Sequence, residues 1–187
     1  MTTTGRLVLR VLVGGLFVGH GTQKLFGWFG GGGPERTGEM FESAGLGPGR
    51  RNALAAGTAE ATGGALLATG LATPLAASML SGVMFTAVRT VHWDKGVWNT
   101  NGGYEYPSVM LAAVFALAEA GPGRLSLDRV LGTERRGLLW ALAQLAAGAI
   151  ASDRIIRAGR RRAVDTPAGP TAVPGEEVQE TQVRRAA

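Results

Sequence analysis

Three polar side chains able to hold or exchange a proton lie close together near the start of the chain. His20, Gln23 and Lys24 stand at the far end of an apolar run that extends from about Leu7 to Phe29. On a helix His20 and Lys24 are four residues apart and face the same way, and Gln23 lies one step around. Imidazole and ammonium groups can donate hydrogen bonds to a ligand, but in an apolar segment they need partners. The rest of the chain must supply those partners.

Later segments contain candidate partners. Glu60 lies about eight residues inside the second apolar segment, where an isolated charge costs about 2.5–3.5 kcal/mol, so we expect it to pair with Lys24 or Arg89. A carboxyl group at this depth can bind a ligand or exchange a proton, and a purely structural ion pair is the alternative. The further candidates for ligand binding or proton handling are Arg89, His92, Asn101, Tyr104, Glu105 and Tyr106.

Most of these residues also have a structural interpretation. The ammonium group of Lys24 can extend to the membrane interface, and the charged or polar side chains of Arg89 and His92 can anchor a helix end. Tyr104 and Tyr106 fit the aromatic belts found where helices leave a membrane. The sequence leaves these alternatives open and assigns no residue a catalytic role.

Four apolar segments that approach the thickness of a bilayer predict an all-α fold, an integral membrane four-helix bundle. Short turns containing Gly or Pro separate several of them. Helices that reverse direction at each loop bring alternate ends together, so the polar residues named above should lie in the same half of the bilayer. The four segments cover about residues 7–29, 52–71, 75–91 and 108–120.

The remaining segments are shorter or more polar. Residues 137–151 form a fifth apolar segment, short for a span but too uniformly apolar for a surface helix, and we expect a fifth crossing there. Residues 35–46 fit either an amphipathic helix or a loop, and residues 125–131 a short surface helix. We therefore divide the chain into a four-helix membrane domain (1–132), an apolar helix with a basic end (133–162) and a disordered tail (163–187).

Composition excludes several kinds of function. Without cysteine the chain forms no disulfide and no Cys-ligated metal site, and we predict no metal centre. The net charge is +5, but the basic residues cluster beside apolar segments, above all at residues 154–162, a pattern typical of membrane topology and not of nucleic-acid binding. Haem ligation by His20 and His92 is disfavoured, because it needs two opposed imidazoles and His92 has the position of an interfacial loop residue.

The basic segment at residues 154–162 also bears on orientation. The positive-inside rule puts it in the cytoplasm. With four spans the amino terminus shares that side and the polar site faces outward. With five spans the amino terminus lies on the opposite side and the polar site faces the cytoplasm.

Three motifs give the chain a family resemblance. Occurring in the same order over about residues 5–132, they resemble the DoxX family of small bacterial membrane proteins, which is named for its similarity to the small membrane subunit of a thiosulfate:quinone oxidoreductase. The motifs are Gly19-His20-Gly21-Thr22-Gln23-Lys24-Leu25-Phe26-Gly27, Glu60 followed by Gly63-Gly64, and Asn101-Gly102-Gly103-Tyr104-Glu105-Tyr106-Pro107 leading to Gly121-Pro122-Gly123-Arg124.

The resemblance implies a multi-pass protein of the bacterial cytoplasmic membrane whose four-helix core positions a quinone or docks a soluble redox enzyme, in sulfur metabolism or in thiol and oxidative stress. Two functions follow, and neither makes the chain an enzyme by itself. In one, His20 or Lys24 donates to a quinone carbonyl, Glu60 exchanges the proton, and Tyr104 and Tyr106 line the entry. In the other, the chain is a non-catalytic anchor or assembly scaffold; a carrier of small organic solutes is a third possibility.

Overall fold

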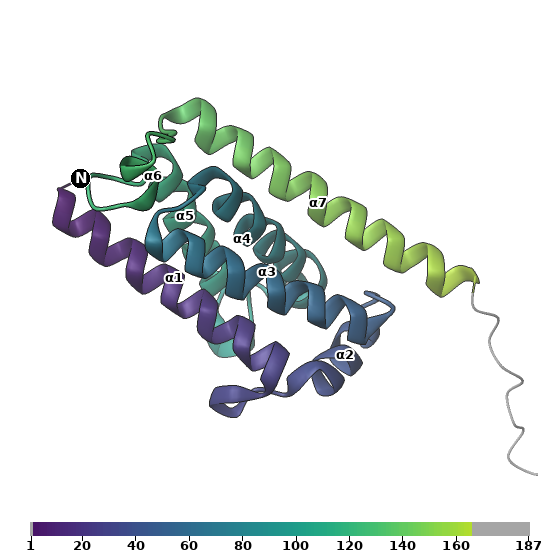
Figure 1. The fold of residues 1–187 in the computed structure, drawn as a ribbon. Coiled ribbons are helices and arrows are strands. Elements are labelled where there is room, and N and C mark those ends of the chain that lie inside the picture. Colours follow the sequence, from purple (N-terminus) through teal and green to yellow (C-terminus); the bar gives the residue numbers. More distant parts are fainter. Residues whose placement is uncertain (1, 166–187) are drawn as a thin grey trace, which may run out of the picture.

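The computed structural model describes residues 2–165, and it is built from helices, with no strand in this part of the chain. The all-α prediction is therefore confirmed. The predicted disordered tail, residues 163–187, lies almost entirely outside the described residues. Figure 1 shows the long helices lying side by side, with two short ones at the ends of the bundle. The helices are α1 (Thr3–Phe26), α2 (Gly33–Ser43), α3 (Gly49–Thr69), α4 (Thr73–Ala87), α5 (Glu105–Ala120), α6 (Leu127–Val130) and α7 (Leu138–Asp165).

Turn chemistry sets the helix ends. The Thr2 hydroxyl accepts a hydrogen bond from the Gly5 N–H and caps the start of α1. Gly27 ends α1 and Gly70 ends α3, both in the left-handed conformation that glycine adopts without strain. Beyond Ala87, α4 continues into a π-helical turn, Val88–His92, and then a 3-10 turn, Trp93–Lys95. These turns lead into the loop that returns to α5.

Glycine lets α1 and α3 approach closely. A Cβ on Gly14 would lie 2.5 Å from the Gly64 carbonyl oxygen, and a Cβ on Gly21 would lie 2.6 Å from that of Gly57. Such contacts between small residues are the usual way in which membrane helices pack, because lipid provides no hydrophobic force to bring helices together. Behind this contact, Phe17, Leu67, Leu80, Val114 and Leu117 form a fully buried apolar core between the four helices.

The fifth long helix, α7, runs parallel to α4 along the outside of the bundle (Figure 1). Three contacts show that α7 runs in the same direction as the segment beginning with α4, because higher residue numbers on one side contact higher residue numbers on the other. Ser81 donates to Gln144 (2.8 Å), the hydroxyl oxygens of Thr86 and Ser152 lie 3.0 Å apart, and Arg89 faces Asp153 at 3.5 Å. The predicted fifth apolar segment, residues 137–151, is thus only the first half of a helix of 28 residues.

Within residues 2–165, two helical segments are long and apolar enough to cross a membrane, Thr73–Lys95 and Leu138–Arg161. The other three predicted crossings, in α1, α3 and α5, are not among them. The α5 helix, with 16 residues, is too short to meet the length criterion. In α1 and α3, glycines and polar residues lower the mean hydropathy. Membrane crossing by α1, α3 and α5 remains a prediction.

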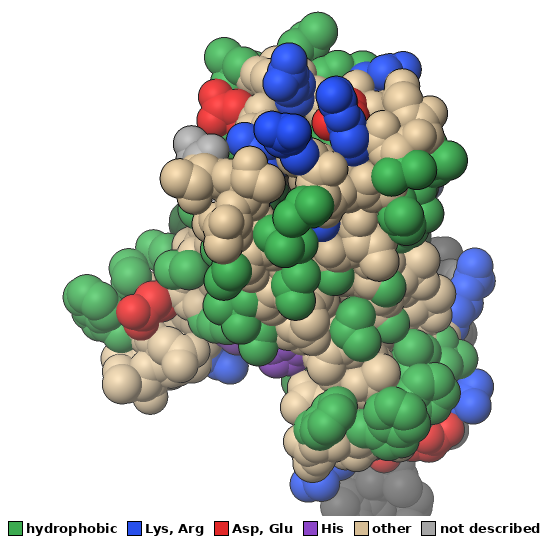
Figure 2. Space-filling view, turned by 60° about the vertical axis from the view of Figure 1, so that its left-hand side comes forward, with side chains coloured by type: hydrophobic (Ala, Val, Ile, Leu, Met, Phe, Trp, Pro, Cys, Tyr) green, Lys and Arg blue, Asp and Glu red, His purple; other side chains and the backbone are tan. Residues whose placement is uncertain are grey.

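Apolar side chains nevertheless cover much of the outside. On α1, Val8, Val11, Leu12 and Leu16 are all more than 40% exposed. In Figure 2 hydrophobic side chains spread over the middle and lower part of one face, while Lys and Arg gather at its upper end. We call the end of the bundle that holds Thr3 the amino-terminal end, and the opposite end, reached by Lys24, the cluster end. Exposed aromatic side chains lie at the cluster end, namely Phe26, Trp28, Phe29, Trp93 and Trp98.

Candidate functional site

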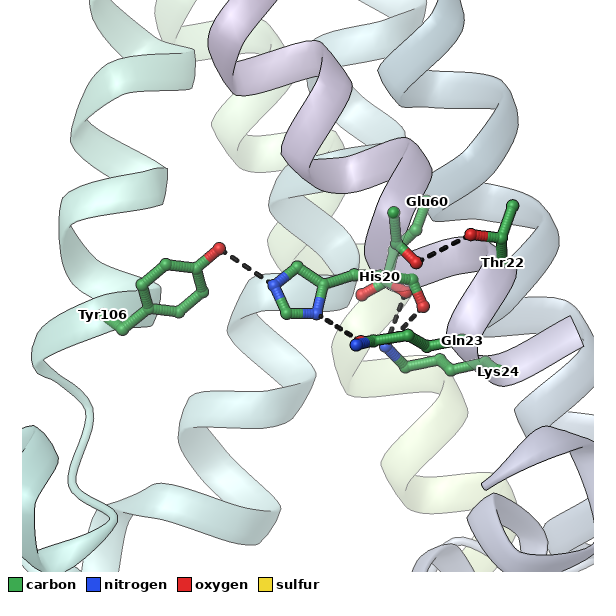
Figure 3. Close-up of polar contacts among 7 residues, drawn as sticks. His20, Thr22, Gln23, Lys24, Glu60 and Tyr106 are labelled. Atoms are coloured by element: carbon green, nitrogen blue, oxygen red, sulfur yellow. Dashed lines mark hydrogen bonds and ion pairs between the residues drawn. The ribbon is translucent and has the colours of Figure 1, made fainter. Parts of the chain in front are cut away.

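Five of the predicted site residues meet at one place, and we call this group the polar cluster: His20, Gln23, Lys24, Glu60 and Tyr106. The Lys24 ammonium group donates to Glu60 Oε2 at 2.6 Å. The imidazole of His20 lies between two partners, with Nδ1 3.1 Å from Gln23 Oε1 and Nε2 3.0 Å from the Tyr106 hydroxyl (Figure 3). The predicted choice for Glu60 between Lys24 and Arg89 is therefore resolved in favour of Lys24.

Three helices position the cluster. On α1, the spacing of four puts His20 and Lys24 on one face, and the Lys24 ammonium group also lies 3.4 Å from the His20 carbonyl oxygen. From α3, Glu60 reaches this face because the glycine contacts hold the two helices close together; a Cβ on Gly57 would lie 3.1 Å from Lys24 Cβ. The third helix, α5, supplies Tyr106 from its first turn.

The Lys24–Glu60 ion pair is almost removed from solvent. The side chain of Glu60 is 2% exposed and that of Lys24 is 19% exposed. In such surroundings a charge is tolerated only when a partner compensates for its lost hydration. Removing one member would therefore leave the other charge buried without a partner and destabilise the bundle.

The polar cluster lies on the wall of a cavity of about 550 Å³. This volume is within the range of ligand pockets, which is about 300–1,000 Å³. Four cluster residues line it, His20, Lys24, Glu60 and Tyr106, together with His92. The rest of the wall is mainly apolar, with Met40 and Phe41 from α2, Ala55, Ala56 and Ala59 from α3, Met79, Val83 and Ala87 from α4, and Ala151 and Ile155 from α7. Figure 2 shows a histidine side chain in the hollow between the two lobes at the lower end of the molecule.

The other predicted site residues are engaged elsewhere. Arg89 faces Asp153 of α7, and both side chains are partly exposed. His92 Nδ1 donates to the Gly102 carbonyl oxygen at 2.6 Å, so it holds the loop before α5 although it lines the cavity. In that loop Tyr104 stacks on Trp93 with ring centres 5.6 Å apart. These residues shape one side of the cavity or its surroundings and do not join the polar cluster.

Two loop residues also lie apart from the cluster. Glu105 is exposed and accepts a hydrogen bond from the Asn99 N–H at 2.9 Å. Asn101 is exposed and closes the turn through its backbone N–H, which donates to the Trp98 carbonyl oxygen. Both residues therefore fit a role in shaping the loop between α4 and α5.

The side chains at the site indicate which kinds of ligand, metal ion, haem or organic molecule, it can bind. Among residues 2–165 no group of three or more His, Asp or Glu side chains could bind a metal ion. Both ring nitrogens of His20 already have hydrogen-bond partners, so axial ligation of haem by His20 would break one of these bonds. An apolar cavity with hydrogen-bonding groups at one side instead suits a lipophilic molecule with a polar head.

Two buried charged residues at the amino-terminal end were not predicted from the sequence. Arg10 is 3% exposed, and its guanidinium donates to the carbonyl oxygens of Ala68, Pro122 and Leu125. Asp128 is 1% exposed and accepts three hydrogen bonds from Ala72 and Thr73 at the start of α4 and a fourth from the Thr133 hydroxyl. Arg10 lies near the start of the first apolar segment and Asp128 in the predicted surface helix 125–131, both places where charged residues are common. Neither position carries a local signal of burial.

Comparison with known proteins finds one matching protein family. No curated protein and no solved structure matches the chain. The family model named DoxX matches residues 5–93, just under half of the chain. The matched stretch runs from the first turn of α1 to Trp93 and includes four of the five polar-cluster residues, namely His20, Gln23, Lys24 and Glu60. DoxX proteins are a membrane-associated family, and the match over residues 5–93 supports membership of this chain in it.

Proposed function

We propose that the protein is an integral membrane subunit that binds a quinone in the cavity beside the polar cluster, and that a soluble redox partner supplies or removes the electrons. The observation that carries this proposal is the position of His20, Lys24, Glu60 and Tyr106 on the wall of one mainly apolar cavity. An apolar wall suits the ring and tail of a quinone, and the cluster suits its polar head. When bound, the quinone supplies two carbonyl oxygens that accept hydrogen bonds and a ring that accepts electrons.

The cluster residues have distinct roles in this proposal. The Lys24 ammonium group has three N–H bonds, of which two point to Glu60 and to the His20 carbonyl oxygen, leaving one for a ligand oxygen. Glu60 accepts from Lys24 through Oε2, so its second oxygen is left to exchange a proton. His20 acts through Tyr106 and does not donate directly, because both of its ring nitrogens are engaged.

The lack of thiols bears on the electron source. The chain has no cysteine, so no dithiol of its own can exchange electrons with a ligand. A partner that docks at the cluster end, next to the cavity, would be well placed to exchange electrons with the bound ligand. The exposed loops on either side of the hollow offer the nearest surface.

The parallel packing of α7 on α4 supports five crossings, with the polar cluster near the cytoplasm. α7 carries its basic end to the cluster end, where exposed basic residues outnumber those at the amino-terminal end. The cluster end has Arg36, Arg50, Arg51, Arg89, Lys95, Arg154, Arg157, Arg160 and Arg161, and the amino-terminal end has Arg124, Arg129, Arg135 and Arg136. The positive-inside rule then orients the bundle in the bacterial cytoplasmic membrane.

The test is mass spectrometry of the organic extract from detergent-purified protein, comparing the wild type with Glu60→Gln. Near-stoichiometric quinone in the wild type and little in the variant is the expected result. Glu39→Gln is the matched control, because Glu39 is exposed at the same end of the molecule and contributes nothing to the cavity wall. Circular dichroism and thermal melting establish that all three proteins are folded.

A non-catalytic anchor or scaffold is the second candidate, and one observation favours it. Lys24 and Glu60 lie 2.6 Å apart and are almost buried, as the members of a purely structural ion pair would be. On this alternative none of the three proteins retains quinone, and any loss of function in Glu60→Gln follows the amount of folded protein in the membrane.

A further inference from the structure

A directed chain of hydrogen bonds links the loop after α1 to the cavity wall. Gln23 Nε2 lies 3.3 Å from the Phe29 carbonyl oxygen, which can only accept. The amide nitrogen of Gln23 must therefore face Phe29, and its oxygen Oε1 must face His20. This fixes the orientation of an amide group whose two ends would otherwise be interchangeable.

The orientation of Gln23 determines the tautomer of His20. Because Gln23 Oε1 accepts, His20 Nδ1 carries the hydrogen of the 3.1 Å bond between them. In the neutral imidazole the other nitrogen, Nε2, then has only a lone pair. The Tyr106 hydroxyl, 3.0 Å away, must donate to it. What Tyr106 has left for the cavity is the lone pairs of its oxygen.

The loop that starts this chain is held in an unusual conformation. Phe29 adopts φ 52° and ψ 36°, the left-handed region that bulky residues rarely enter. Gly31 packs directly on Gln23, since a Cβ at Gly31 would lie 2.5 Å from both Gln23 Cβ and its carbonyl oxygen. Strain of this kind is kept where the surrounding structure requires one backbone orientation. Here that orientation aims the Phe29 carbonyl at the Gln23 amide.

We propose that Tyr106 accepts a hydrogen bond from a hydroxyl group of the ligand, so that with neutral His20 the cavity prefers the reduced, dihydroxy form of a quinone to the oxidised, dicarbonyl form. The inference rests on the proposed function and specifies its ligand. A carbonyl oxygen next to the Tyr106 oxygen would bring two acceptors together, whereas a hydroxyl group donates to Tyr106 and can still accept from Lys24. Tyr106 lines the cavity, and the Gln23–His20 pair determines that the Tyr106 oxygen offers the ligand lone pairs and not a hydrogen.

Protonation of His20 reverses this preference. Both ring nitrogens then donate, so Tyr106 accepts from Nε2–H and turns its own hydrogen toward the ligand. The titratable groups that face His20 are Lys24 on its own helix, Glu60 on α3, Tyr106 on α5 and, across the same cavity, His92 in the π-helical turn after α4. Acidification therefore shifts the preference from the dihydroxy to the dicarbonyl form.

The experiment measures binding of menadiol and menadione, kept under anaerobic conditions, to the full chain in phospholipid nanodiscs. Equilibrium dialysis against empty nanodiscs corrects for partition into lipid. At about pH 8, where an ordinary histidine is neutral, we expect menadiol to bind about 10-fold more tightly than menadione, the effect of one hydrogen bond. Tyr106→Phe should bring this ratio to about 1. Tyr104→Phe, at the other tyrosine of the chain, should leave it unchanged.

A redox-inert pair gives an independent check. In 4-butylanisole, the methyl ether of 4-butylphenol, a methyl group replaces the hydroxyl hydrogen. Only the phenol can therefore donate a hydrogen bond to Tyr106. The wild type should prefer the phenol, and Tyr106→Phe should lose that preference. As the pH is lowered stepwise from about 8, the menadiol preference of the wild type should fall, and that of Tyr106→Phe should not change.

The outcomes separate the two proposals. Equal or tighter binding of menadione by the wild type at about pH 8, or a menadiol preference that survives in Tyr106→Phe, would overturn the assignment of Tyr106 as acceptor and leave quinone binding intact. Failure of both menadiol and menadione to bind would overturn the proposed function, and the inference with it.

Discussion

Single residues at the two ends of the bundle compensate buried charge in different ways. At the cluster end Glu60 has one strong partner, the Lys24 ammonium group. At the amino-terminal end the Asp128 carboxylate accepts from the N–H groups of Ala72 and Thr73 and from the hydroxyls of Thr73 and Thr133. Asp128 thereby supplies the side-chain cap for α4 that Ala72 cannot provide, and it holds Ala72 at φ 47°.

The first prediction concerns the Lys24–Glu60 pair. Either Lys24→Met or Glu60→Gln alone should lower the free energy of unfolding by about 3 kcal/mol, because a buried charge loses its partner. The double variant removes both charges and should cost clearly less than the sum of the two single changes. Thermal or denaturant unfolding in detergent measures the cycle. Additive single effects would mean that the two side chains do not interact in solution.

The second prediction concerns pH and Asp128. Burial raises the pKa of the Asp128 carboxyl, but the hydrogen bonds donated by Thr73, Ala72 and Thr133 outweigh it and hold the pKa below its ordinary value. A carboxyl with a lowered folded-state pKa stabilises the protein above its unfolded-state pKa, about 3.9, and loses this stabilisation as the pH falls through the folded-state pKa. The melting temperature should therefore fall below about pH 4 in the wild type.

Two variants isolate this contribution. Asp128→Asn should melt at a lower temperature at neutral pH, by the equivalent of about 1–3 kcal/mol, and should show less of the acid-induced loss. Asp94→Asn, at an exposed position, should behave like the wild type. An acid transition of unchanged size in Asp128→Asn would assign the pH dependence to other groups.

At the level of helices, close packing between α1 and α3 places Lys24 against Glu60. The two glycines on either side of His20 differ sharply in their surroundings. A Cβ on Gly21 would meet the backbone of Ala61 at 2.5 Å, whereas a Cβ on Gly19 would meet nothing within 4 Å. Backbone atoms cannot move aside as a flexible side chain can, so a methyl group at position 21 forces the helices apart.

The third prediction compares these glycines. Gly21→Ala should destabilise the protein by about 1–3 kcal/mol through overpacking and should weaken ligand retention. Gly19→Ala should be neutral or slightly stabilising, because alanine favours a helix over glycine by up to about 1 kcal/mol. The free energies of unfolding of the two variants, measured under the same conditions, test this prediction. Equal destabilisation would contradict the close contact between Gly21 and the backbone of α3.

The sequence predicted some elements well because their signals are local. Apolar runs ended by Gly and Pro located α1, α3, α4 and α5, and the cost of burying Glu60 pointed to a cationic partner. Which tyrosine joins His20 was not predictable, because Tyr104 and Tyr106 are two residues apart and point in nearly opposite directions on a helix. Only the packed structure separates Tyr106, on the cavity wall, from Tyr104, on Trp93.

Other features depend on contacts far apart in the sequence. The burial of Asp128 requires the short helix α6 to fold back onto the start of α4, and an isolated Leu-Asp-Arg-Val segment reads as surface. The length of α7 was underestimated because its arginine-rich second half is polar. The cavity was not foreseeable, since α2 and α7, which close it, contribute mainly apolar residues without a motif.

For the whole molecule, the parallel arrangement of α4 and α7 separates two topologies. If α7 crosses the membrane beside α4, the loop before it lies on the opposite side from its basic end. If α7 instead lay on the membrane surface, both would be on the same side. The contacts between Ser81 and Gln144 and between Thr86 and Ser152 favour the crossing, because they fix α7 along most of α4.

The fourth prediction uses the absence of cysteine, which makes every introduced cysteine unique. Gly132→Cys, in the loop before α7, should react with a membrane-impermeant maleimide in intact cells. Arg157→Cys, near the basic end, should react only after the cells are permeabilised. Thr4→Cys should follow Gly132→Cys, because both lie at the amino-terminal end. Labelling of positions 132 and 157 from the same side would rule out a crossing α7.

The cavity wall draws its charge and part of its enclosure from different segments of the chain. His20, Lys24 and Glu60 lie on α1 and α3, whereas Ala151 and Ile155 reach the wall from α7. Because α7 contributes no member of the Lys24–Glu60 ion pair, larger side chains at positions 151 or 155 should reduce the size of the molecule that fits while leaving the ion pair intact.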